Sequence, residues 1–104
     1  MGMMKFEVPH QLSKDQARER VNRLFEYWGR KYGIQSDWSG DRAHLSGKVM
    51  GIGIDARLEV TFRAVSGEAS DPGFLLRDKA RRYLTDKFNA ALDPEAAPDR
   101  PPED

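Results

Sequence analysis

The chain contains no cysteine. It therefore has no disulfide framework, no thiolate zinc site and no cysteine nucleophile, which fits a reducing compartment. The formal net charge is zero, because Lys and Arg together number 17 and Asp and Glu together number 17. No overall electrostatic field therefore attracts nucleic acid or an anionic membrane. No apolar run approaches the roughly 18 residues of a membrane-spanning helix. We expect a cytoplasmic protein.

What is present is enough for one modest core. The chain has 104 residues, of which 38% are hydrophobic and 33% charged, and this length and composition predict a single domain. The segment 93–104 differs from the rest, because it holds four of the six prolines and no aromatic residue. We expect residues 1–92 to fold and residues 93–104 to form a disordered acidic tail.

The longest regular pattern is an alternation over residues 52–62. Every even position, up to and including Phe62, is apolar, and the odd positions after Gly53 are polar. Such alternation predicts a strand with one face on a core and the other in water. Gly53 near its start is predicted to mark a bulge.

Two further segments alternate in the same way, residues 5–10 and residues 41–49. The first ends at Pro9, which cannot donate to a β-ladder. The second is separated from the long strand by Met50-Gly51, a pair that permits a tight reversal. These residues predict a short first strand and an antiparallel hairpin.

Two segments have the helical period. Ser13 and Gln16 have the spacing of a capping box, and Gly33 supplies a left-handed stop, so the sequence predicts a helix over 14–32. A turn region at 66–73, in which Ser70 or Asp71 is the predicted cap, precedes a second helix over about 72–92.

These elements define an α+β fold in the order strand, helix, strand, strand, helix. We expect an antiparallel sheet of three strands, or four if the long strand breaks, with both amphipathic helices on one face. Such a sheet has unpaired edges, and pairing an edge across a two-fold axis would give a homodimer.

The sequence offers little catalytic chemistry. The segment 51–56 fits the dinucleotide pattern G-x-G-x-x-A, but that chemistry needs the glycines to open a helix, and here they open a strand. His10 and His44 lack the spacing of metal ligands, and no Gly-x-Ser-x-Gly elbow is present. We therefore predict no enzymatic activity, no cofactor and no metal site.

The helices carry the candidate interaction surfaces. The second helix has five basic residues against two acidic ones, and Arg77, Arg81 and Arg82 could contact phosphates, although a solvated face is the commoner role. The first helix has an aromatic stripe that includes Trp28. Such a stripe either covers the sheet of its own domain or lies on an external apolar surface.

A third kind of site is a pocket between the helices and the sheet. Trp38 and His44 are further candidate interaction residues. A well-formed cavity that reaches Trp38, His44 or Tyr83 would favour a small ligand-binding domain.

Single residues scattered along the chain carry a family resemblance: Pro9-His10, Ser13 with Ala17 and Arg18, Tyr32-Gly33, Trp38, Gly40-Asp41, His44-Leu45 and Gly51. In this order they resemble the polyhydroxyalkanoic acid system family, which consists of small bacterial proteins associated with polyhydroxyalkanoate granules. The resemblance covers roughly residues 4–92. It implies a cytoplasmic bacterial protein linked to storage-polyester granules, and it brings no catalytic residue.

From this resemblance we predict a non-enzymatic accessory or interaction protein of the granule system, located in the cytoplasm or at the granule surface. Its implied partners are the granule or proteins associated with it. Two alternatives stay open: a nucleic-acid-binding module that uses the second helix, and a small ligand-binding domain. The zero net charge argues against nucleic acid.

Overall fold

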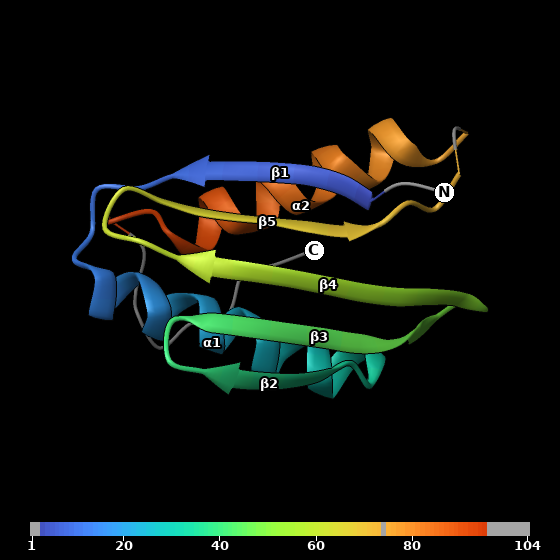
Figure 1. Cartoon of the computed structure of the whole chain (residues 1–104), viewed down its shortest axis with the longest axis horizontal. Coiled ribbons are helices and arrows are strands. Elements are labelled where there is room, and N and C mark those ends of the chain that lie inside the picture. Colours follow the sequence, from blue (N-terminus) through green and yellow to red (C-terminus); the bar gives the residue numbers. More distant parts are fainter. Residues whose placement is uncertain (1–2, 74, 96–104) are drawn as a thin grey trace.

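The computed structural model describes residues 3–73 and 75–95, and in this part of the chain five strands and two helices form an α+β fold (Figure 1). The strands form one antiparallel sheet in the order β1-β5-β4-β3-β2. The predicted class is confirmed, but the predicted count of three or four strands is wrong. In chain order the elements are β1 (Met3–Pro9), α1 (Lys14–Tyr32), β2 (Gln35–Ser39), β3 (Arg42–Val49), β4 (Ile52–Val60), β5 (Ala64–Ser70) and α2 (Arg77–Ala91).

The two strands that sequence reasoning missed have weak patterns. β5 occupies most of the segment 66–73 that composition predicts as a turn, because Ser, Gly and Glu replace the usual β-branched residues. It nevertheless lies inside the sheet, between β1 and β4, and its Val65 is fully buried. β2 has only five residues and one large apolar side chain, Trp38.

The long predicted strand breaks after Val60, which is the alternative that the sequence analysis left open. The Thr61 hydroxyl accepts hydrogen bonds from the backbone N–H groups of Arg63 (3.2 Å) and Ala64 (3.1 Å), which closes a turn. Phe62 therefore lies in this turn and is 68% exposed, so its predicted place in the core is wrong. The predicted bulge at Gly53 is also wrong, because the register between β3 and β4 runs unbroken and pairs Gly53 with Lys48.

α1 has the predicted bounds and caps. The Ser13 hydroxyl accepts from the Gln16 N–H, and the Gln16 side chain accepts from the Ser13 N–H, which is the expected capping box. Gly33 ends the helix with φ +74°, a conformation that glycine adopts at little cost. The apolar stripe of α1, from Ala17 to Trp28, is buried against the sheet and α2.

α2 begins later than predicted and without the predicted cap. Its N-cap residue is Leu76, which makes no side-chain cap hydrogen bond. Asp71 instead accepts from the Gly73 N–H (2.9 Å) and pairs with Arg77 (2.8 Å), so it orders the approach to the helix. At the other end Arg20 of α1 donates to the carbonyl of Ala91, the last residue of α2, at 3.5 Å and to the Asp93 carbonyl at 2.6 Å, which joins the two helices.

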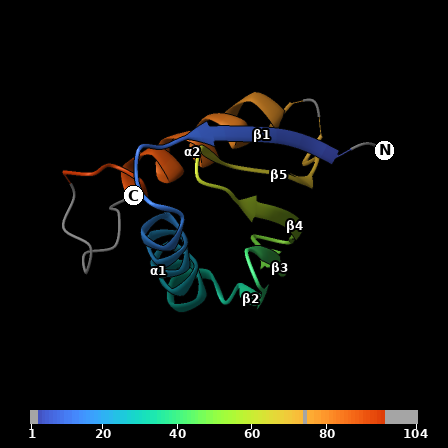
Figure 2. The ribbon, with the colours of Figure 1, turned by 60° about the vertical axis from the view of Figure 1, so that its left-hand side comes forward.

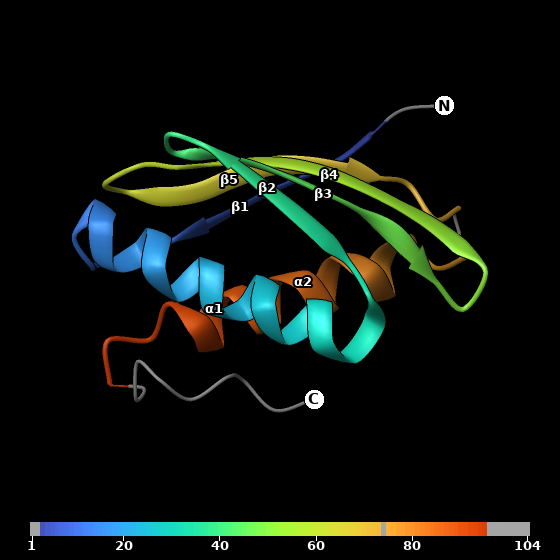
Figure 3. The ribbon, with the colours of Figure 1, turned by 90° about the horizontal axis from the view of Figure 1, so that it is seen from below.

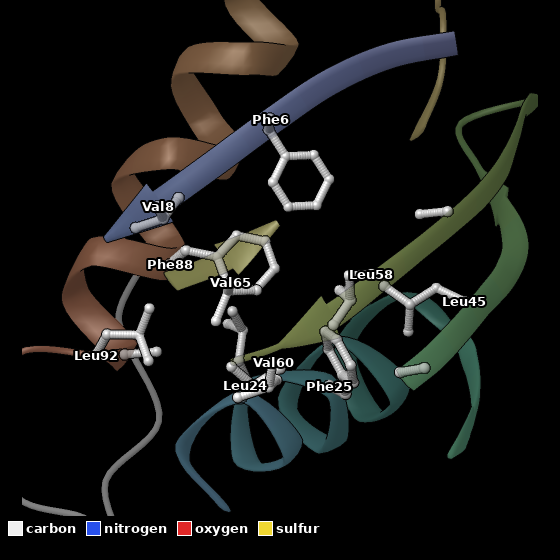
Figure 4. Packing of buried hydrophobic residues seen from close by; sticks show 14 of the residues in the cluster. Phe6, Val8, Leu24, Phe25, Leu45, Leu58, Val60, Val65, Phe88 and Leu92 are labelled. Carbon is white, nitrogen blue, oxygen red and sulfur yellow. The ribbon is translucent and has the colours of Figure 1, made fainter. Parts of the chain in front are cut away.

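Both helices lie on one face of the sheet, as predicted (Figure 3). Figure 2 shows the sheet curving around the helices. The core between the layers is centred on Phe25 and Phe88, whose ring centroids are 6.4 Å apart (Figure 4). Phe6 from β1 stacks on Phe88 at 5.4 Å, and both Phe25 and Phe88 are fully buried.

The predicted acidic tail lies mostly outside the described residues, which end at Glu95. In the described part of the chain, neither helix is long and apolar enough to cross a membrane.

Candidate binding groove

A groove of about 360 Å³ lies between the two helices and the sheet. The groove is open because small side chains, those of Ala56, Ala69 and Ala80, line it. At the opposite end of the core, phenylalanine rings fill the corresponding space. Its other walls come from both helices and four strands and include Met4, Trp28, Ile34, Leu45, Ile54 and Leu84.

Exposed apolar side chains gather around this groove. Met50, Ile52 and Leu76 belong to its lining, while Leu75 is the chain neighbour of the lining residue Leu76. We call Met50, Ile52, Leu75 and Leu76 the apolar rim. Among the residues that the structure describes, the rim contains four of the six exposed large hydrophobic residues. The other two are Met3, which is on the outer face of the sheet because its neighbour Met4 faces the groove, and Phe62, which lies in the turn beyond the opposite end of β4. Clustering of this kind is typical of an interaction surface.

Met50 is the most exposed member of the rim and sits in an unfavourable backbone conformation. With Gly51 it forms the two-residue turn between β3 and β4, and both residues have positive φ, +53° and +82°. Asparagine or glycine is the favoured residue at such a position. The Met50 side chain is 95% exposed, so contacts within the fold do not offset its backbone strain. A strained, exposed apolar residue beside a groove is a candidate for function.

The groove also contains a small polar group of aromatic residues. The Trp28 indole N–H donates to the Tyr83 hydroxyl at 3.3 Å, and Tyr83 also hydrogen bonds with Tyr32. Burial, together with the Tyr32 hydrogen bond, raises the pKa of Tyr83 to about 12, so the folded chain retains this proton to higher pH than an exposed tyrosine does. Among the residues that the structure describes, Lys79 is the only charged one in the lining.

The tryptophans and histidine proposed from sequence lie in different places. Trp28 forms part of the groove wall and is 3% exposed. Trp38 lies beside the first half of α1, where its indole N–H donates to Asn22 at 2.9 Å. His44 is on the outer face of the sheet, paired with Asp55 at 3.0 Å. The structure therefore does not bring these three residues together.

The arginines proposed from sequence differ in their surroundings. Arg77 is paired with Asp71, whereas Arg81 and Arg82 are exposed on the helix surface. None of the three lines the groove. Whether they contact a partner stays a prediction.

Trp38 and His44 do line a second hollow, a shallow depression of about 600 Å³ on the outer face of the sheet. Five of its ionisable residues form one cross-strand row, in which the register places Lys5, Glu68, Arg57, His44 and Asp37 side by side, and the other two, Arg42 and Glu59, are cross-strand partners. Neighbours in this row are largely of opposite charge and can satisfy one another. The depression therefore presents no surplus of either charge.

The other histidine has a structural role. His10 Nδ1 accepts from the Leu12 N–H at 3.1 Å, so its Nε2 carries the proton that is donated to the Thr61 carbonyl at 2.7 Å. These bonds join the loop before α1 to the turn after β4. In residues 3–73 and 75–95, no group of three or more His, Asp or Glu side chains could hold a metal ion.

Sequence reasoning named Tyr83 and Trp28 but missed most of the groove, including Ile34, Ile54 and Lys79. Their positions depend on how strands distant in sequence are paired. Met50 did offer a signal, because an apolar residue in a two-residue turn beside glycine is unusual.

The fold and groove define a class of protein: a small α+β module whose five-stranded antiparallel sheet and two helices leave one apolar groove open. Residues 4–94 match the model of the family described as "Putative polyhydroxyalkanoic acid system protein". The chain belongs to this family, which confirms the resemblance seen in the sequence. Searches of curated proteins and of solved structures found no significant match.

Proposed function

We propose that this protein is a non-enzymatic accessory protein of the polyhydroxyalkanoate system that binds storage polyester through its apolar rim and groove. The observation that carries the proposal is the gathering of exposed apolar side chains around an open apolar groove. The repeating units of a polyester of hydroxyalkanoic acids are uncharged and present aliphatic side chains, so apolar contact is the main interaction open to a protein that binds the polymer. The family description supports a place in this system.

The rim has the properties needed for contact with a particle surface. Met50 projects from a hairpin tip, and Leu75, which is 82% exposed, precedes α2 at the same end of the molecule (Figure 1, right). Unbranched methionine adapts to irregular apolar surfaces. Each such side chain transferred from water to an apolar surface contributes roughly 1–2 kcal/mol.

The test is co-sedimentation of the purified full chain with polyhydroxyalkanoate particles. We expect the wild type to sediment with the particles and the double variant Met50→Asn, Leu75→Asn to bind at least about tenfold more weakly, because two apolar contacts are removed. Both positions are on the surface, so the fold should be retained.

Phe62→Asn is the matched control. Phe62 is an exposed large hydrophobic residue at the far end of β4, outside the rim. The proposal fails if the wild type stays in the supernatant, or if Phe62→Asn weakens sedimentation as much as the double variant. A parallel pull-down from cells that accumulate polyester, with and without nuclease, distinguishes granule binding from the nucleic-acid alternative. Recovery that depends on nucleic acid would contradict the proposal.

A further inference from the structure

The charge that the groove lining carries is positive. The lining contains no aspartate or glutamate, and its single charged residue is Lys79, in the first turn of α2. In the described part of the chain, residues 3–73 and 75–95, Lys79 takes part in no ion pair. An apolar groove with one available cation is complementary to a molecule that combines an apolar chain with one anionic group. The repeating ester units of the polyester carry no charge for this lysine to pair with.

The hydroxyl group of Tyr83 lies on the same helix as Lys79. Tyr83 is four residues further along α2, so the two side chains are neighbours on one helix face, about one turn of 5.4 Å apart. The Tyr83 oxygen accepts from Trp28 and is hydrogen bonded with Tyr32. The lining has a third hydroxyl, that of Ser70, which is already bonded to the Asp55 N–H and the Gly53 carbonyl. The two tyrosine hydroxyls therefore suit a ligand that carries a hydroxyl group close to its charged end.

We propose that the groove binds a single hydroxyalkanoic acid, with its carboxylate at Lys79, its hydroxyl group at Tyr83 and Tyr32, and its alkyl chain along the alanine-lined floor. This inference rests on the proposed function, since it names the monomer of the polyester as a second ligand of the same site. The volume of about 360 Å³ lies in the range of roughly 300–1,000 Å³ that small-molecule sites occupy.

The chain provides its own reporter for a test. Trp28 lines the groove, and Trp38, the only other tryptophan, lies outside it. In the variant Trp38→Phe, fluorescence therefore reports on the groove alone. We would titrate this variant with 3-hydroxydecanoic acid, with its methyl ester and with decanoic acid, and repeat the acid titration on the wild type by calorimetry.

We expect the hydroxy acid to change Trp28 fluorescence and to bind at least about tenfold more tightly than its methyl ester, which lacks the negative charge. Lys79→Gln should weaken binding of the acid about tenfold and leave the ester unaffected. Arg82→Gln, which removes an exposed cation of the same helix outside the lining, should change neither. Tyr83→Phe should remove the preference for the hydroxy acid over decanoic acid.

Equal binding of acid and ester, with no effect of Lys79→Gln, would overturn the carboxylate assignment while leaving polyester binding intact. No binding of any of the three ligands, or a dimer in solution that occludes Trp28, would overturn the inference as a whole. Conversely, acid binding by a chain that does not sediment with polyester particles would defeat the proposed function alone.

Discussion

At the scale of single residues, Gly67 is the position where the sheet tolerates least change. It lies in β5 between Phe6 of β1 and Leu58 of β4. A Cβ atom here would overlap the Arg57 carbonyl oxygen and approach the Leu58 Cα to 2.7 Å. Glycine is required because two backbones come close together, a role that strand glycines often have.

We expect Gly67→Ala to lower the free energy of unfolding by about 3 kcal/mol or more, since the added methyl group meets backbone atoms that cannot rotate away. Urea denaturation measures this change. Gly53→Ala is the control, because Gly53 is also in a strand but has no atom within 4 Å of an added Cβ. Its effect should stay below about 1 kcal/mol, and equal losses in the two variants would refute the steric explanation.

At the scale of elements, the β3–β4 hairpin should gain stability when its turn residue is replaced. Met50→Asn places at φ +53° a residue that tolerates the left-handed conformation, and Asn-Gly is the preferred pair for this turn. We expect an increase of about 0.5–1 kcal/mol in the free energy of unfolding, measured by thermal or urea denaturation.

Met50→Gln separates the effect of the Met50→Asn change on stability from its effect on polyester binding. Glutamine removes the apolar side chain as asparagine does, but it offers no relief of backbone strain. It should leave stability nearly unchanged and should weaken polyester binding as much as Met50→Asn. A stabilising Met50→Gln would show that the strain is not the cause.

The elements also differ in how far they can be predicted from sequence. α1 is predictable to the residue, because its capping box, its apolar stripe and Gly33 are local signals that agree. β5 is not, since its strand conformation comes from pairing with β1 and β4 on its two sides rather than from its own small polar residues. Phe62 was placed in the core because alternation continues past Val60, but the Thr61 turn interrupts the strand there.

At the scale of the whole molecule, stability should fall at alkaline pH because of Tyr83. Its pKa is raised from 10 to about 12 in the folded state, chiefly by burial. Between these pH values the unfolded chain has released the proton and the folded chain retains it, so stability decreases as pH rises. Thermal melting across this range should show a smaller decrease in Tyr83→Phe than in the wild type. Identical profiles would contradict this assignment.

The groove is a whole-molecule feature too, which explains why sequence reasoning identified only parts of it. Residues of β1, β5 and α2 meet there, although they lie at opposite ends of the chain. Periodicity identifies which side of each element is apolar, and so it identified Tyr83 and Trp28. It does not reveal that alanines from different elements line the floor together, or that Lys79 is the single charged residue of the described lining.

The place of β1 in the sheet has a consequence for how the chain folds. Met3 pairs with Ser70 and Pro9 with Ala64, so the first strand to be synthesised has no partner until most of the chain has followed. The β3–β4 hairpin, joined by two residues, can close early, whereas closing the loop to β1 carries a larger entropic cost and slows folding. During synthesis on the ribosome, β1 cannot pair until β5 has been synthesised. Until the two strands pair, β5 presents an open edge to other nascent chains.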